Sequence, residues 1–335
     1  MIPQKKYSPN LIKRLFLKIK SEGLLNTTLL IFKKLANRID SPGNLFKPTL
    51  RQRNLLIKFR KIILLNRFKK AKEKRGIIKN NSVYKIEKDK GYKLISSDNI
   101  SLEELRQSLL NQFNIETDSL EEFEQRSSLN ISGKGTPIIP INSDHINNNE
   151  LLLRFLTSDQ IISSIAEYIG VMPWLYSADI WLSRASETIE NSSQHFHMDW
   201  EDQKIVKLFF FLDDITEHHG PFCLINKEDT QRVIDHYDER YKSKIVSQRL
   251  SDDEVYKVVD KEKLIKLTGP KNSIALVDTC NILHFGSRPS RFPRKMMACM
   301  YASPFSIQNY IFQKSKFSKT MTNEIDEPLS WVINH

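Results

Sequence analysis

Apolar residues recur at helical spacing through the first quarter of the chain. Three stretches, at residues 11–19, 25–36 and 54–74, place apolar side chains three or four positions apart, with Lys and Arg at most positions between them. This spacing is the period of one helix face. The turn-forming sequence Asp-Ser-Pro-Gly at 40–43 separates the second stretch from the third. The pattern predicts three basic amphipathic helices.

From about residue 80 the pattern becomes that of a mixed α and β chain. Ser101-x-x-Glu104 and Thr157-x-x-Gln160 have the spacing of a capping box, and each precedes an apolar helix face. The second of these helices is expected to stop at Gly170. Residues 114–149, which are polar and carry Gly and Pro, are predicted to be rich in loops.

Beyond Gly170 the pattern is that of β-strands. The segments 176–185, 204–212, 273–278 and 296–302 are short, apolar, and partly aromatic or β-branched. Residues 227–268 interrupt them with charged sequence and the helix-start spacing Ser251-x-x-Glu254, which predicts a helical insertion. Because no βαβ rhythm is present, the pattern favours an antiparallel sandwich or barrel.

Charge divides the chain more sharply than periodicity does. Residues 1–79 contain 22 Lys and Arg against 3 Asp and Glu, a local net of +19. The totals of 51 basic and 40 acidic residues leave 29 and 37 for the rest of the chain, a net of −8. The sequence therefore predicts a basic helical arm over 1–79, a body over 80–320 and a C-terminal tail over 321–335.

The arm limits the choice of partners and of location. Basic amphipathic helices suit an anionic membrane surface, whereas a helical cap packed on the body and a nucleic-acid contact are the alternatives. No helix-turn-helix pattern or aromatic-interleaved basic strand supports nucleic acid.

The N-terminal sequence lacks the apolar core of a signal peptide, and the three cysteines are too few and too widely spaced for a disulfide framework. We expect a cytoplasmic protein, peripheral at the membrane surface; the sequence does not indicate its oligomeric state.

Metal-ligand chemistry is concentrated in the segment 194–200, QHFHMDW. On an extended backbone alternate side chains share a face, so His197 and Asp199 can reach one ion. Two histidines and one carboxylate on one face of an octahedron are typical of ferrous iron and leave positions open for a 2-oxo acid and dioxygen. A third ligand must come from elsewhere in the chain.

His284 and Arg294 complete this hypothesis. His284 follows the predicted strand 273–278 and lies two residues before Gly286, which lets the backbone approach closely. Ten residues later, Arg294 directly precedes the strand 296–302. If the chain reverses between these strands, the planar guanidinium of Arg294 can hold a carboxylate with two hydrogen bonds.

Other residues compete for these roles. His195 shares the predicted strand face with His197, and together with Glu201 these two histidines fit the first metal motif of small cupins. The second cupin motif is missing before His284, so we interpret His195 as a candidate pocket residue, along with Trp200 and Lys207.

Three arginines, Arg288, Arg291 and Arg294, are candidates for the cosubstrate, and spacing favours Arg294.

These motifs resemble the phytanoyl-CoA dioxygenase family of 2-oxoglutarate oxygenases over about residues 91–305. The matching text is HFHMDWEDQKIVKLFFFLDDITEHHGPF and, later, VDTCNILHFGSRPSRFPRKMMACMYASP. The resemblance implies that His197, Asp199 and His284 bind Fe(II), and that Arg294 binds 2-oxoglutarate. It also implies an α+β protein with a mainly β core, a double-stranded β-helix (jelly roll, cupin-like) flanked by helices. The chain departs from the family at residues 224–228, LINKE, where members often carry a Pro-Gly-Ser-His turn, and the resemblance does not reach residues 1–79.

The expected function is therefore that of an Fe(II)/2-oxoglutarate-dependent dioxygenase. With O2 as second cosubstrate it would hydroxylate a small-molecule or lipid/glycan-type substrate and release succinate and carbon dioxide. Two alternatives stay open: a catalytically silent binding protein on the same fold, or an adaptor that acts on a membrane or polyanion surface through the basic arm.

Overall fold

The computed structural model describes most of the body of the chain and two helices that precede it. The described residues are 50–78, 84–96, 102–115, 138–183, 185, 192–237, 249–286, 288, 290–306, 325 and 327–333. The helices predicted over 11–19 and 25–36 lie outside this range, as does most of the predicted tail. The division into arm, body and tail stays a prediction.

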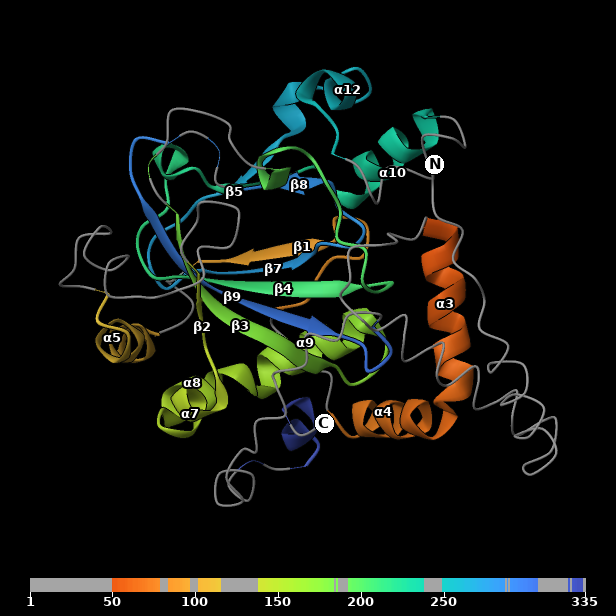
Figure 1. Cartoon of the computed structure of the whole chain (residues 1–335), viewed down its shortest axis with the longest axis vertical. Helices are drawn as coiled ribbons and strands as arrows, with labels where there is room; N and C mark the ends of the chain where they lie inside the picture. Colours follow the sequence, from red (N-terminus) through yellow and green to blue (C-terminus); the bar gives the residue numbers. More distant parts are fainter. Residues whose placement is uncertain are drawn as a thin grey trace, which may run out of the picture.

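Two antiparallel sheets form the centre of the molecule (Figure 1). The large sheet has the order β1-β7-β4-β9-β3-β2, and the small sheet has the order β6-β5-β8. The strands of the large sheet are β1 (Tyr92–Ile95), β7 (Ile274–Asp278), β4 (Ile205–Phe211), β9 (Arg294–Ala302), β3 (Trp174–Ser183) and β2 (Ile138–Pro140). Those of the small sheet are β6 (Ile265–Leu267), β5 (Phe222–Leu224) and β8 (His284–Phe285).

The two sheets pack face to face through one apolar cluster. Its members come from β4, β7 and β9 on one side and from β5 and β6 on the other: Phe209, Phe211, Phe222, Leu224, Leu267, Ala275, Val277, Met296 and Ala298. Because side chains alternate along a strand, the other face of the large sheet carries a second apolar set. Successive strands cross from one sheet to the other, as β6, β7, β8 and β9 do, or skip a neighbour within the large sheet, as β3 and β4 do. This is a double-stranded β-helix, and it confirms the predicted fold class.

Helices cover the outer face of the large sheet (Figure 1). They are α5 (Glu103–Gln112), α7 (Ser143–Asn147), α8 (Glu150–Leu156) and α9 (Asp159–Ile169). Gly170 ends α9 in the left-handed conformation, as predicted. The capping prediction at Thr157 is wrong, because its hydroxyl donates to the Leu153 carbonyl at the end of α8, and Ser158 precedes α9.

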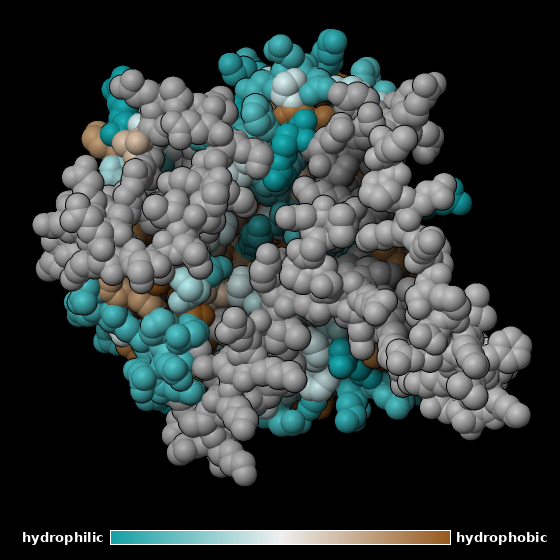
Figure 2. All heavy atoms as spheres, viewed as in Figure 1, coloured by the Kyte–Doolittle hydropathy of each residue, from teal (hydrophilic) through white to brown (hydrophobic). Residues whose placement is uncertain are grey.

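The predicted insertion at 227–268 is helical only in part. It contains α10 (Lys227–His236), α12 (Asp252–Tyr256) and a short 3-10 turn at Lys261–Lys263, and then β6, which pairs with β5. The capping box at Ser251 and Glu254 is present as predicted. Hydrophilic side chains gather over α12 at the upper end of the molecule (Figure 2). Further short 3-10 turns are Ser192–Gln194, Glu217–His219 and Leu329–Val332.

The helix predicted over 54–74 is divided into two, α3 (Leu50–Ile63) and α4 (Leu65–Ile77). The chain turns at Leu64, whose ψ of 37° leaves the helical range. α3 packs on the body: Ile57 is buried, Arg53 donates to the Cys280 carbonyl at 3.2 Å, and Arg60 donates to the Phe305 carbonyl at 2.9 Å. Among the described helices, none is long and apolar enough to span a bilayer.

Candidate metal centre

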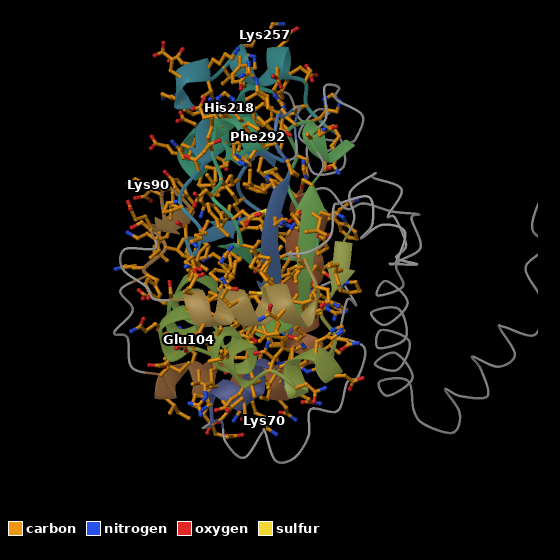
Figure 3. The ribbon with its side chains drawn as sticks, turned by 90° about the vertical axis from the view of Figure 1, so that its left-hand side faces the viewer. Lys70, Lys90, Glu104, His218, Lys257 and Phe292 are labelled. Carbon is orange, nitrogen blue, oxygen red and sulfur yellow. The ribbon has the colours of Figure 1, made fainter. Side chains whose placement is uncertain are left out.

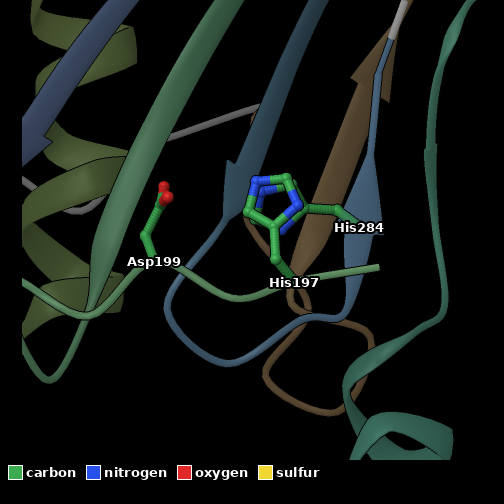
Figure 4. A group of neighbouring side chains, drawn as sticks. All are labelled: His197, Asp199 and His284. Carbon is green, nitrogen blue, oxygen red and sulfur yellow. The ribbon is translucent and has the colours of Figure 1, made fainter. Parts of the chain in front are cut away.

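Three potential metal ligands from distant parts of the chain meet between the two sheets. His197 and His284 pair as neighbouring strand residues, because each backbone N–H donates to the other's carbonyl at 3.0 Å. Asp199 is held at the end of β7 by its N–H, which donates to the Thr279 carbonyl at 2.8 Å. One ligand atom from each of the three side chains lies within 4.8 Å of the others (Figure 4). The structure thus brings together the three residues that the sequence singled out.

Both histidines are oriented by their own backbone. Nδ1 of His197 lies 2.9 Å from the His195 carbonyl, and Nδ1 of His284 lies 2.9 Å from the Ile282 carbonyl. A carbonyl can only accept, so Nδ1 carries the proton in each ring and Nε2 presents its lone pair. Burial lowers the pKa of His284 to about 4 and holds that of His197 well below its usual range. Both imidazoles are therefore neutral at neutral pH, which is the ligating form.

Asp199 has a cationic neighbour in Lys207 of β4. The Lys207 ammonium lies 2.7 Å from Asp199 Oδ2, and both side chains are partly exposed, at 19% and 16%. Burial opposes ionisation of Asp199, but the charge of Lys207 and its hydrogen bond to the carboxylate outweigh burial and lower the pKa of Asp199. The carboxylate is ionised and available to a cation, and Lys207 supplies its counter-charge in the absence of one.

This donor set fits a divalent transition metal. Two imidazole nitrogens and one carboxylate oxygen form the facial arrangement that non-haem iron enzymes use, and all three groups are in their ligating protonation states. The hydrogen bonds at Nδ1 supply the outer support that such ligands need. His195 is exposed, and neither it nor Glu201 belongs to the cluster of ligand atoms in the part of the chain described. The geometry therefore favours the set His197, Asp199 and His284 over the cupin-like set.

The three candidate arginines occupy different environments. Arg294 is 1% exposed at the start of β9, and donates to the Gly220 carbonyl at 2.6 Å and to the Ser183 hydroxyl at 3.1 Å. These two partners are neutral, and burial lowers the pKa of Arg294 to about 10. Arg288 instead forms a two-fold ion pair with Asp252, and Arg291 is exposed. Of the three arginines, Arg294 is thus the one that is fully buried, and its partner Gly220 lies just before β5 of the small sheet.

The remaining predicted pocket residues differ in position. Lys207 contacts Asp199, as described above. Trp200 is partly buried and packs beside Ile57 of α3 and Phe305, where it joins the site to α3. His195 contributes its carbonyl to His197, while its side chain is exposed.

Asp179 on β3 is a site residue that the sequence reasoning overlooked. It pairs with Ala298, a member of the cluster between the sheets, and cross-strand partners share a face. Burial raises the pKa of Asp179 to about 6, against the effects of Ser177 and Lys207. The available signal was the single charged residue of β3, at a position that faces inward.

The fold and this site together define a double-stranded β-helix protein with a candidate centre of two histidines and one carboxylate. No family model matches the chain, and no curated protein matches its sequence.

Solved structures do resemble it. The crystal structure of EctD from S. alaskensis with 2-oxoglutarate and 5-hydroxyectoine is 13% identical, over 64% of this chain and 73% of that chain, with a TM-score of 0.44. The non-heme alpha ketoglutarate dependent carbocyclase SnoK from nogalamycin biosynthesis is 10% identical, over 68% and 85%, with a TM-score of 0.43. HygX from Streptomyces hygroscopicus with nickel and 2-oxoglutarate is 13% identical, over 65% and 84%, with a TM-score of 0.41. The geometry of the site, rather than these likenesses, carries the functional inference.

Proposed function

We propose that this chain is an Fe(II)- and 2-oxoglutarate-dependent dioxygenase that hydroxylates a small-molecule or lipid/glycan-type substrate. The observation that supports this most is the meeting of His197, Asp199 and His284 within 4.8 Å, with both Nδ1 atoms committed to backbone carbonyls. A group of this composition leaves one face of a six-coordinate ion open. A structural site, in contrast, closes all positions with protein ligands.

In this proposal the residues have separate tasks. His197, Asp199 and His284 hold the iron, and Arg294 holds the distal carboxylate of 2-oxoglutarate in the two-bonded geometry that a guanidinium provides. The bound iron supplies the oxidation of the substrate by O2, coupled to conversion of 2-oxoglutarate into succinate and carbon dioxide. Membership of the phytanoyl-CoA dioxygenase family, and a cytoplasmic location peripheral to the membrane, belong to the same proposal.

The test is an anaerobic titration of the purified protein with iron(II) and then 2-oxoglutarate, followed by visible absorption. We expect a charge-transfer band that is absent in His197→Ala and retained in His195→Ala. The second variant is a matched control, because it removes an exposed imidazole two residues away. Two results would contradict the proposed centre. One is a band of equal strength in both variants, and the other is the absence of a band in the wild type.

Admitting oxygen separates the proposal from a silent binding protein on the same fold. An active enzyme forms succinate at a rate that His197→Ala lacks. A normal band with no succinate under any condition would favour the binding protein. An adaptor would show neither the band nor succinate.

A further inference from the structure

Large apolar side chains are exposed mainly on α3 and α4. In the described part of the chain, seven such side chains are exposed, and five of them lie within residues 50–77: Leu55, Phe59, Ile62, Leu65 and Ile77. The other two, Leu151 and Phe292, lie singly elsewhere. Isolated exposed apolar residues are ordinary, whereas a concentration of them marks a contact surface.

α3 carries large apolar side chains on its outward face as well as on its buried one. Its buried face carries Arg53 and Arg60, which donate to backbone carbonyls of the body, together with Ile57. Its outward face carries Leu55 and Ile62, which are 67% and 71% exposed and lie seven residues apart on one side. An amphipathic helix normally turns this apolar stripe inward. The outward stripe therefore has no role in packing α3 on the body.

The same two helices carry a large excess of positive charge. Residues 50–77 contain eleven Lys and Arg and one acidic residue, Glu73. Lys58, Lys69, Lys70 and Lys72 are exposed on the same two helices as the apolar side chains. Lys70 lies at one end of the molecule and Lys257 lies at the other (Figure 3). Exposed apolar groups beside lysines complement a surface that offers both hydrocarbon and negative charge.

We propose that α3 and α4 form a docking surface for an anionic lipid bilayer. Leu55, Ile62 and Leu65 enter the boundary between headgroups and acyl chains, while the lysines contact lipid phosphates and carboxylates. A nucleic acid would use the lysines but leave the apolar stripe in water, and a neutral protein partner would use the stripe but not the charge. An anionic bilayer uses both features.

This surface adjoins the candidate metal centre through α3. Arg53 donates to the carbonyl of Cys280, in the loop between Thr279, which holds Asp199, and His284. Lys61 donates to the side chain of Gln203 at 3.0 Å, and Ile57 packs beside Trp200, the residue after Asp199. A bilayer bound to α3 would thus lie against the helix that supports the site. The docking gives a surface and a lipid class to the peripheral membrane location in the proposed function, and it does not depend on the oxygenase chemistry.

The experiment is cosedimentation of the full chain with vesicles of 30% phosphatidylserine in phosphatidylcholine, and with pure phosphatidylcholine. We expect binding to the anionic vesicles that weakens as salt rises. Lys69→Gln with Lys70→Gln should weaken it about 25-fold, since each lysine near the surface contributes about five-fold. Leu55→Ser with Ile62→Ser should weaken it at least about ten-fold, although neither side chain supports the fold.

Matched controls are placed away from the surface. Lys257→Gln with Lys261→Gln removes the same charge from the opposite end, and Leu151→Ser removes an exposed apolar group from α8; both should bind as the wild type does. Binding unchanged in the two α3–α4 variants would assign the vesicle contact to another part of the chain and overturn the proposal. If only the lysine variant lost vesicle binding, and the wild type bound heparin as strongly as vesicles, the surface would be a polyanion site. That result would also overturn the proposal.

Discussion

Arg288 and Arg294 lie six residues apart, yet their guanidinium groups have opposite environments. Arg288 is neutralised by Asp252, at 2.6 and 2.8 Å. The hydrogen bonds of Arg294 to Gly220 and Ser183 go to neutral oxygens. A buried guanidinium presents planar N–H donors that suit a carboxylate ligand. The burial of Arg294 and the ion pair of Arg288 both support the assignment that spacing favoured.

Replacement of Arg294 tests this role directly. Arg294→Lys keeps the charge but removes the planar fork, so we expect 2-oxoglutarate to bind about 10- to 100-fold more weakly, with iron(II) binding retained. The exposed Arg291→Lys should bind both as the wild type does. Anaerobic titration of the iron-loaded proteins with 2-oxoglutarate measures the difference. Equal affinities in the two variants would remove Arg294 from the cosubstrate site.

Asp202 connects the start of β4 to the end of β9 and should make stability depend on pH. It accepts hydrogen bonds from the N–H and hydroxyl of Ser303 at 2.9 and 2.6 Å, and burial raises its pKa from 3.8 to about 6. Between these values the folded protein keeps a proton that the unfolded chain has released. The stabilisation is therefore present below the unfolded pKa and is lost as pH rises through 6, by about 3 kcal/mol.

Asp202→Asn cannot titrate, so its stability relative to the wild type should increase by about 2 kcal/mol between pH 4 and pH 7, because the unfolded carboxyl is already partly ionised at pH 4. Urea unfolding of both proteins at the two pH values measures this, with the exposed Asp253→Asn as control. Parallel changes in wild type and Asp202→Asn would show that Asp202 does not keep a raised pKa.

At the scale of elements, Arg288 links the insertion to the site, in addition to the backbone bridge between Leu250 and Phe196. Arg288 bonds Asp252 at the start of α12 and lies over the Phe285 ring, with 3.3 Å between its Cζ and the ring centroid. Phe285 follows His284 in β8, so the position of α12 and that of a candidate ligand are coupled.

A double-mutant cycle on Arg288 and Asp252 should give a coupling of about 1 kcal/mol, because Asp252 is 43% exposed and solvent screens the pair. Arg288→Ala should cost more than Asp252→Ala, since it also loses the contact with Phe285. Urea unfolding of the four proteins measures both quantities. If the two single variants lost the same stability, the ring contact would contribute nothing.

At the scale of the whole molecule, the described part of the predicted basic arm packs on the body. Its part at 50–77 is attached to the body by buried Ile57 and by two arginines that bond carbonyls of Cys280 and Phe305. A chain that begins at residue 50 keeps these contacts, whereas one that begins at residue 80 loses them.

We expect the chain that lacks residues 1–79 to have a lower free energy of unfolding than the chain that lacks residues 1–49. The difference should be at least about 4 kcal/mol. One buried isoleucine contributes about 2–3 kcal/mol and each hydrogen bond about 1 kcal/mol. Denaturant unfolding of the two truncated chains measures the difference. Equal stabilities would show that α3 and α4 fold apart from the body.

The sequence by itself determined what depends on local pattern. The strand pattern, the Gly170 stop, the capping box at Ser251 and the alternation of His197 with Asp199 follow from the period of the backbone and the chemistry of each residue type. The prediction from local pattern was wrong at Thr157. Its hydroxyl donates to a carbonyl at the end of α8 and therefore does not cap the start of α9.

Only the tertiary structure decided which distant residues meet. The pairing of His197 with His284, the ion pair that occupies Arg288, and the inward position of Asp179 depend on strand register, which is set by packing between sheets and not by neighbours in sequence. The sequence could not predict the outward apolar face of α3 either. Periodicity identifies an apolar stripe on a helix, but the elements that pack against the helix decide which side is buried.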